Sequence, residues 1–389
     1  MTTKLPLLSL AIGAFGIGVT EFTPMGMLPL IGGDLGASIP AMGLVVSAYA
    51  LGVLFGAPLM TLATAGMPRR RLLVGLMGIF VLGNLMAALA TSYEMLIFAR
   101  VITSLNHGAF FGVGSVVAAG LVAPERRGAA VATMFSGLTV AAIVGGPLAA
   151  WIGEVAGWRT VFWIITAVGL AAMTALRFAL PPLPVEGRAD MRSELRVLGR
   201  GSVLAALALT TISFSAMFTV FTYIVPILRI ETGATTSFVS LVLFLSGVGL
   251  AFGNWLGGQL AGRSVDGTIL WSLVLHVAIL VLFAWGMRSA VPATLLVVAW
   301  GVACFATVSP LQMRVMEAAV EAPNLASAMN IGAFNLANAI GAALGGAVID
   351  AGFGYPAVSF AGAGMAGAGL LLLLALHLRR PVMSVTAGS

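Results

Sequence analysis

Apolar stretches of about 20 residues recur along the whole length of this chain. Each is long enough to cross a hydrocarbon core of about 30 Å as an α-helix. The chain is 60% hydrophobic and 8% charged, which is outside the composition of soluble globular proteins. We therefore predict an all-α membrane protein with twelve transmembrane helices. The predicted spans are 5–31, 41–65, 72–91, 95–122, 129–151, 160–180, 201–228, 236–261, 268–287, 291–313, 325–349 and 355–378.

A cleavable signal peptide is the alternative for the first stretch. Lys4 precedes it, as in a signal peptide, but the apolar run from Leu5 to Ile31 is longer than such peptides carry. We therefore expect this stretch to remain as the first membrane helix.

The positive charges predict the orientation of the chain in the membrane. With the N-terminus inside, 15 cationic residues fall in cytoplasmic segments and 3 fall outside, with Arg100 within a span. Such a bias predicts that both termini are cytoplasmic. The net charge of +6 therefore reflects topology, and we expect no binding to nucleic acid. The cytoplasmic cations are Lys4, Arg69, Arg70, Arg71, Arg126, Arg127, Arg177, Arg188, Arg192, Arg196, Arg200, Arg263, Arg314, Arg379 and Arg380, and the outer ones are Arg159, Arg229 and Arg288.

One polar segment divides the chain into two halves of six spans. We predict an N-terminal six-helix bundle over residues 1–180, a cytoplasmic linker over 181–200 and a C-terminal six-helix bundle over 201–389. The halves resemble repeats, because Gly52-x-x-x-Gly56 in the second span is matched by Gly253-x-x-x-Gly257 in the eighth. Duplicated six-span halves around a central site are the architecture of secondary transporters. Small residues four apart also let helices approach closely, so static packing is the alternative reading of these pairs.

Glu21 is the one acidic residue that lies inside a long apolar run. A carboxylate at membrane depth is expensive, and the default hypothesis for such a residue is a functional role such as carrying a proton.

Several short motifs resemble those of a known family. Arg69 and Arg70 resemble the end of the loop motif G-x-x-x-D-R-x-G-R-(R/K) of the major facilitator superfamily, and Arg263 ends a remnant of the same loop in the second half. Neither loop keeps its aspartate. Gly146-Pro147 resembles the core of the antiporter motif G-x-x-x-G-P-x-x-G-G. Gly157-Trp158-Arg159-x-x-Phe162 matches G-W-R-x-x-F, a further motif of the superfamily.

Taken together, the chain resembles bacterial twelve-span drug/proton antiporters of the arabinose-efflux and chloramphenicol-efflux types. The resemblance implies the major facilitator fold, a location in the bacterial inner membrane and proton-coupled export of small compounds, here amphipathic or hydrophobic ones. It also implies action as a monomer, with the substrate, protons and the lipid bilayer as partners. Arg69, Arg70, Gly146, Pro147 and Arg263 would then serve changes of conformation.

Arg100 has two interpretations. It can snorkel to the nearby membrane surface, or it can be a buried cation close to Glu21, whose depth in the first span is similar. Burial favours a protonated carboxyl group and a nearby arginine favours the carboxylate, and a proton switch requires this opposition. We predict Glu21 and Arg100 as the proton-coupling pair. His107 is a further candidate, although a lone histidine on an apolar helix is also a common core residue.

Polar and aromatic residues of other spans are candidates for a substrate cavity. Asparagines can line such a cavity or hold helices together, and aromatic rings can bind a substrate or pack. The candidates are Tyr49, Asn106, Phe214, Phe218, Tyr223, Asn330, Phe334, Asn335 and Asn338.

The sequence offers no motif for catalysis. It contains no H-E-x-x-H, no G-x-x-x-x-G-K-(S/T) and no Cys/His ligand set, and its one cysteine, Cys304, excludes an internal disulfide. We therefore expect no enzymatic activity, no cofactor and no metal site. A sugar or nucleoside efflux permease is the alternative transporter, and a passive channel or a membrane scaffold is the alternative from another class.

Overall fold

A computed structural model describes residues 4–64, 66–123, 127–181, 197, 199–321 and 323–378. Twelve helical segments of this part are long and apolar enough to cross a membrane, which confirms the predicted all-α membrane fold. Most of the predicted linker, 182–196 and 198, lies outside the described residues, as do Arg126, Arg379 and Arg380.

The first seven helices pack together into one bundle, which we call the first bundle. Its closest pairs are α1 with α6 and α3 with α7. Its helices are α1 (Lys4–Leu35), α2 (Ile39–Ala63), α3 (Arg69–Ala88), α4 (Tyr93–Ser104), α5 (His107–Gly120), α6 (Arg127–Ala156) and α7 (Trp158–Ala179).

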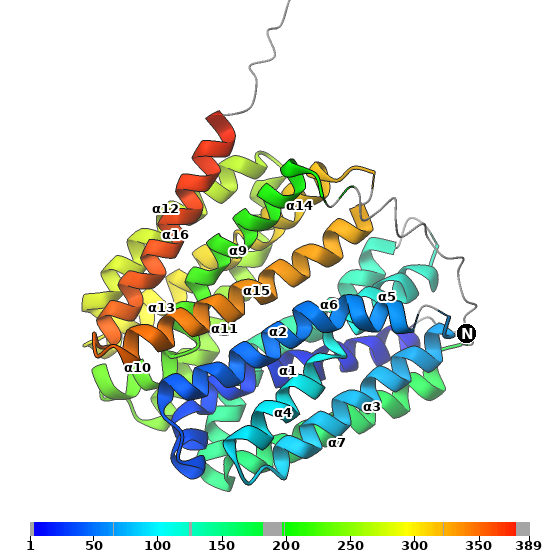
Figure 1. The fold of residues 1–389 in the computed structure, drawn as a ribbon, viewed down its shortest axis with the longest axis horizontal. Helices are drawn as coiled ribbons and strands as arrows, with labels where there is room; N and C mark the ends of the chain where they lie inside the picture. The colour runs from blue at the N-terminus through cyan, green and yellow to red at the C-terminus, as the bar shows by residue number, and fades with distance from the viewer. Residues whose placement is uncertain are drawn as a thin grey trace, which may run out of the picture.

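The remaining helices form the second bundle, in which α9 packs against α15 and α16, and α11 against α13. Its helices are α9 (Gly201–Phe221), α10 (Ile224–Glu231), α11 (Thr236–Ala261), α12 (Val265–Gly286), α13 (Ala290–Phe305), α14 (Val308–Ala318), α15 (Pro323–Asp350) and α16 (Tyr355–Leu378). Figure 1 shows the two bundles side by side.

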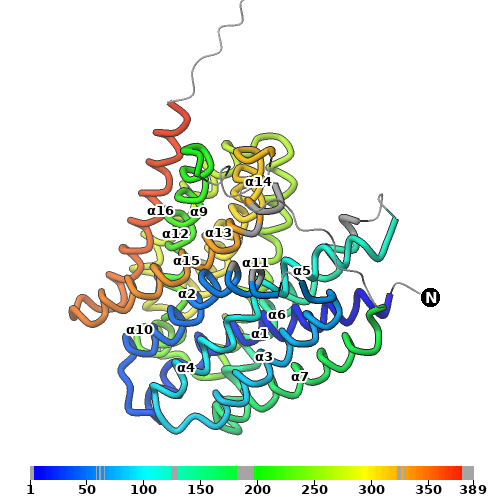
Figure 2. Tube along the Cα trace, turned by 45° about the vertical axis from the view of Figure 1, so that its right-hand side comes forward, coloured from blue at the N-terminus to red at the C-terminus, as the bar shows by residue number. Residues whose placement is uncertain are grey.

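The bundles meet along two helix pairs, α2 with α15 and α6 with α11. Figure 2 shows them close together around α10 and the start of α2, and spreading apart toward α14 and the start of α1. We call the end that carries the start of α1 the terminal end, and the other the opposite end. The two bundles are therefore joined at the opposite end.

Three of the predicted spans are interrupted helices rather than continuous ones. The tenth breaks between α13 and α14, and the seventh between α9 and α10. Pro310 and Pro226 explain these breaks, because each lacks the N–H that would bond to the carbonyl four residues earlier. The fourth span breaks between α4 and α5, where Leu105 N bonds to Ile102 O in a tighter turn.

The glycine pairs of α2 and α11 hold equivalent helices in the two bundles. Gly52 faces Ser104 and Val101 of α4, and Gly253 faces Val302 of α13. Gly56 faces Leu105 and Gly257 faces Ala306, which directly follow the ends of α4 and α13. The second glycine of each pair therefore packs at the break of its neighbouring span.

We expect Gly257→Ala to lower the unfolding temperature of the purified protein. The added Cβ would overlap the carbonyl oxygen of Ala306 and lie 2.7 Å from its C and Cα atoms, and these main-chain atoms cannot move aside as a flexible side chain can. Overpacking of this kind costs roughly 1–3 kcal/mol. Gly258→Ala is the matched control, since the nearest atom to its Cβ is Ser309 Oγ at 3.7 Å. Equal unfolding temperatures for the two variants in detergent would contradict the close contact.

Candidate functional site

Glu21 lies in the middle of α1 with its side chain half-buried. Within the part of the chain that the structure describes, its carboxyl group makes no hydrogen bond and no ion pair. It lies close enough to Arg100 and Tyr49 to interact with both electrostatically. Glu21 is thus a carboxyl group at membrane depth with an arginine nearby and, among the described residues, no direct hydrogen-bond partner.

Arg100 of α4 is buried, with 1% of its surface exposed, so it does not reach the membrane surface. Its Nη1 donates a hydrogen bond of 2.7 Å to the carbonyl oxygen of Thr20. Its Cζ lies 4.1 Å from the ring centroid of Tyr49, in cation–π geometry. Among the described residues, its Nε and Nη2 have no hydrogen-bond partner. The guanidinium group is therefore held in place and still has donors free for another group.

His107 and Tyr49 complete the polar group around Glu21. The Tyr49 hydroxyl and His107 Nδ1 are hydrogen-bonded at 2.9 Å, and both side chains are buried. The His107 ring also packs on Phe111, with 5.1 Å between the centroids. We call Glu21, Tyr49, Arg100 and His107 the Glu21 cluster. It joins four helices of the first bundle, namely α1, α2, α4 and α5.

Two residues that were not predicted from the sequence, Thr20 and Asn84, help to hold the Glu21 cluster in place. The Thr20 hydroxyl donates to Asn84 Oδ1 at 2.6 Å, and Asn84 Nδ2 donates to Phe80 O at 2.9 Å. These bonds tie α1 to α3 next to the carbonyl group that holds Arg100. Asn84 could have been identified in the sequence, because it is the one amide in the apolar run 72–91.

The candidate cavity residues of the second bundle lie apart from the Glu21 cluster. Phe214 packs against Phe334 at 4.7 Å and against Phe218 at 5.8 Å between ring centroids. Phe305 contacts the same ring of Phe214 at 5.8 Å. Tyr223 instead donates a hydrogen bond of 2.7 Å to Ala342 O, so its hydroxyl is engaged between helices. The structure thus brings the three candidate phenylalanines together and places Tyr223 elsewhere.

The candidate asparagines are buried, and several of their amide atoms have no partner among the described residues. Asn330 donates to Gln312 Oε1 at 2.7 Å, and Asn335 donates to Ile331 O at 3.0 Å. Both amide atoms of Asn338 and of Asn106 have no hydrogen bond within this part of the chain, and the same holds for Oδ1 of Asn330 and Asn335. Buried amides without partners are costly, so these side chains have hydrogen-bonding capacity to spare.

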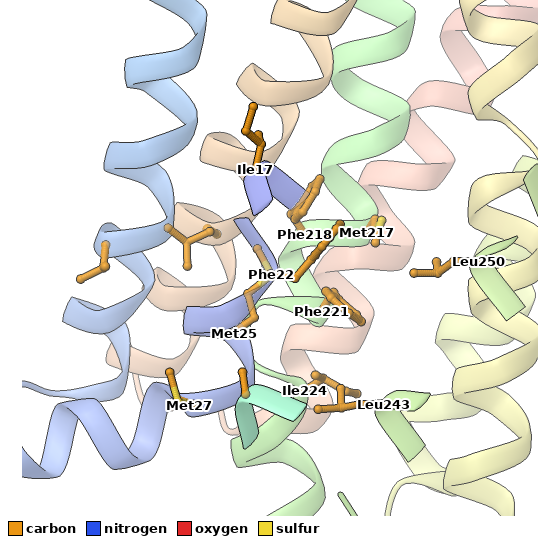
Figure 3. Close-up of a cluster of buried hydrophobic side chains, with 14 of the residues drawn as sticks. Ile17, Phe22, Met25, Met27, Met217, Phe218, Phe221, Ile224, Leu243 and Leu250 are labelled. Carbon is orange, nitrogen blue, oxygen red and sulfur yellow. The ribbon is translucent and has the colours of Figure 1, made fainter. Parts of the chain in front are cut away.

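An apolar contact joins the bundles directly next to Glu21. Phe22 of α1 meets Phe221 of α9 with 6.3 Å between ring centroids. Figure 3 shows Phe22 and Met25 on one side of this contact and Phe218, Phe221 and Ile224 on the other. Gly146 and Pro147 of α6 lie beside it, where α1 approaches α6 closely at Gly26. The contact therefore packs the first bundle against the second at the depth of the cluster.

Polar contacts link the bundles further toward the opposite end. Ser47 donates to Ala339 O at 3.1 Å, and Glu154 of α6 forms an ion pair with Arg229 of α10. Arg229 Nη2 also donates to Thr236 Oγ1 at 2.9 Å. This conformation is therefore closed at the opposite end.

We expect Glu154→Gln to increase opening at this end. About a third of each side chain of the pair is exposed, and such pairs contribute up to about 1 kcal/mol. The open population should therefore rise by up to about fivefold. The measurement is the rate at which an impermeant maleimide labels a cysteine placed at Leu243, which lies beside Phe22 and Phe221. Glu94→Gln removes an exposed carboxylate at the same end and should leave the rate unchanged; equal rates for both variants would contradict the role of the pair.

The remaining motif residues lie at the terminal end. Arg70 Nη1 donates to Leu180 O at 3.2 Å, which ties the first turn of α3 to the end of α7. Arg263 is exposed in the connection between α11 and α12. In the second bundle, His276 accepts a hydrogen bond of 2.6 Å from Trp300 Nε1 and is buried as a core residue.

Comparisons with known proteins agree with this architecture. The family model of the Major Facilitator Superfamily matches residues 10–329. The chain is 51% identical to the inner membrane transport protein YdhP of Escherichia coli (strain K12) over 389 residues, which is all of both chains. It is 32% identical to a chloramphenicol resistance protein of Streptomyces lividans over 347 residues, 87% of each chain.

A solved structure shows the same fold at low sequence identity. The crystal structure of a point mutant of the nucleoside transporter NupG superposes with a TM-score of 0.76 and 16% identity, over 96% of this chain and 100% of that one. With twelve membrane-spanning segments and a family match over most of its length, this chain belongs to the major facilitator superfamily and is a multi-pass inner-membrane transporter.

Proposed function

We propose that this transporter exports small compounds in exchange for protons. The observation that carries the proposal is the Glu21 cluster, in which one membrane-embedded carboxyl group lies near a fixed arginine that has two nitrogen atoms without a partner among the described residues. Ionisable residues inside membrane spans mark proton and substrate pathways. Glu21 would carry the proton and Arg100 would respond to its charge. We assign both termini to the cytoplasm, since the cationic residues lie mainly in the segments at the terminal end.

The free donors of Arg100 suggest how a proton could change the conformation. When Glu21 is ionised, Nε and Nη2 of Arg100 can pair with its carboxylate. When Glu21 is protonated, this attraction is lost and the donors become available to another acceptor. Tyr49 and Thr20 hold the guanidinium in either case, so the movement falls on the side chain of Glu21. His107 takes a secondary part, because its Nδ1 is bonded to Tyr49.

Alternating access would follow from rocking of two halves, residues 1–180 and 201–389, joined by the linker 181–200. With the termini in the cytoplasm, the closed opposite end is the outer one, so this conformation would face inward. Opening outward requires the Phe22–Phe221 and Glu154–Arg229 contacts to separate. A proton would then reach Glu21 from outside as the substrate leaves. Arg69 and Arg70 at the start of α3, Arg263 in the connection after α11, and Gly146–Pro147 of α6 would guide the rocking, and one copy of the chain would suffice.

The substrate is proposed to be a small amphipathic or hydrophobic compound. The phenylalanines around Phe214 supply apolar surface, and Asn335 and Asn338 of α15 supply amide atoms that have no partner among the described residues. Similarity to a chloramphenicol resistance protein supports export of this class of compound. A sugar or nucleoside would use the same amides more fully and remains the alternative substrate.

Transport by everted membrane vesicles tests the proposal. A panel of toxic compounds applied to cells that overexpress or lack the protein would first identify a substrate. Energised everted vesicles should then accumulate this substrate, and a protonophore should abolish the accumulation. Full uptake without a proton gradient would contradict proton coupling. Counterflow separates a carrier from a pore, because preloaded unlabelled substrate accelerates entry of labelled substrate only through a carrier.

A further inference from the structure

A groove lies on the outer side of the second bundle, away from the Glu21 cluster. It has a volume of about 670 Å³ and is lined by α11, α12 and α13. Helix α12 packs against α11, α13, α14 and α16, all in the second bundle, so the groove does not lie between the two bundles. Exposed Trp271 and Leu275 form part of its wall. A groove with exposed apolar walls on a membrane helix opens toward the bilayer.

The length of the groove matches one lipid chain. From Gly267 to Ile279 it follows α12 for about 18 Å at 1.5 Å per residue. This distance runs from the terminal end to beyond the middle of a hydrocarbon core about 30 Å thick. A helix of the same length and about 10 Å across would occupy roughly 1,400 Å³, about twice the volume of the groove. The groove therefore suits one lipid chain better than a whole helix from a second copy.

The polar residues of the groove gather where a lipid headgroup would lie. Arg263 is exposed at the terminal end of the groove, next to the start of α12. Asp266, in the first turn of α12, forms an ion pair with Arg314, and Arg263 forms no ion pair with any residue that the structure describes. Ser272 also lines the groove, is 5% exposed, and makes no hydrogen bond among the described residues. Trp271 stands beside them, and tryptophan favours the headgroup level of a membrane.

We propose that this groove binds an anionic phospholipid, with its phosphate at Arg263 and one acyl chain along α12. Arginine pairs with phosphate in bidentate geometry, and the Ser272 hydroxyl can donate to the ester region below. The acyl chain would contact Val302 and Ala303 near the end of α13, and Ala306 in the break between α13 and α14. The bound lipid would therefore lie against the part of the tenth span where its helix changes direction.

Quenching of Trp271 fluorescence by brominated lipids tests this site. The full-length protein is reconstituted in vesicles that contain dibrominated phosphatidylglycerol or dibrominated phosphatidylcholine at rising mole fraction. The Trp271 signal is the difference between the wild type and Trp271→Phe. We expect half-quenching by the anionic lipid at about fivefold lower mole fraction, the effect of roughly one arginine near a phosphate. Arg263→Gln should remove this preference while quenching by phosphatidylcholine persists.

The matched control is Arg71→Gln, which removes an exposed arginine from the same end of the first bundle. It should keep the preference for the anionic lipid. Equal quenching of the wild type by both lipids would overturn the proposal in favour of unselective lipid contact. Loss of the preference in Arg71→Gln would overturn it in favour of general surface charge. If neither lipid quenches Trp271 and two copies of the chain crosslink through α12, the proposal would be overturned in favour of a second copy that covers the groove.

Discussion

Glu21→Gln is expected to insert and fold, to bind substrate, and to lose accumulation driven by a proton gradient. Glutamine keeps the size and the hydrogen-bonding capacity of glutamic acid but cannot release a proton. Because the carboxyl group of Glu21 makes no hydrogen bond among the described residues, the substitution breaks no hydrogen bond with them. Accumulation in everted vesicles should fall at least tenfold, while counterflow persists. The measurement compares both activities at equal expression.

Two variants separate coupling from structure at this position. Glu21→Asp keeps a titratable carboxyl group on a side chain that is one methylene group shorter, and it should retain part of the accumulation. Glu94→Gln neutralises an exposed carboxylate in the first turn of α4 and should transport as the wild type. If Glu21 were only a packed polar residue, Gln would be tolerated better than Asp. Wild-type accumulation by Glu21→Gln would leave the chain without its proposed proton carrier, and His107 would be the next residue to test.

Arg100→Ala is expected to shift the pH profile of transport to higher pH. The arginine favours the ionised form of the nearby Glu21, so its removal lets the carboxyl group keep its proton at higher pH. A nearby opposite charge shifts the titration of a carboxyl group by about 1–3 pH units. The pH at half-maximal transport should therefore rise by up to about that amount, with a lower maximal rate because Tyr49 and Thr20 lose their partner. Initial rates in everted vesicles over a pH series measure both effects.

Arg100→Lys distinguishes charge from geometry. Lysine keeps the positive charge but lacks the planar group that bonds to Thr20 while it packs on Tyr49. It should keep the pH profile near that of the wild type at a reduced rate. Arg288→Ala, which removes an exposed arginine, should change neither. A lower rate of Arg100→Ala with an unshifted profile would show that the arginine acts on structure alone and would contradict its role beside Glu21.

The hydropathy of the chain was sufficient to predict the twelve spans, because each one must match the bilayer in length and composition. The breaks within three spans were missed, since hydropathy does not report helix direction. Pro310 and Pro226 were visible in the sequence and explain two of the breaks. The break before Asn106 has no such signal, and it depends on how α4 packs against Gly52 and Gly56 of α2.

The candidate site was predictable in part. Glu21 and Arg100 were paired from their similar depth, and the structure places them close together. The bond from Arg100 to the carbonyl group of Thr20 could not be predicted, because main-chain acceptors carry no sequence signal. The link between Tyr49 and His107 needed the packing of α2 against α5, which single residues in separate spans do not reveal.

Proton release on substrate binding tests the central claim most directly. Exchange of substrate for protons requires that each weakens the binding of the other, and both effects have the same coupling free energy. Substrate binding must therefore lower the proton occupancy of the protein. Adding the identified substrate to purified protein in weakly buffered detergent solution, near the pH at half-maximal transport where Glu21 is half protonated, should release up to about half a proton per substrate bound. Glu21→Gln should bind substrate and release none. Substrate binding by the wild type without proton release, or equal release by Glu21→Gln, would contradict proton coupling through Glu21.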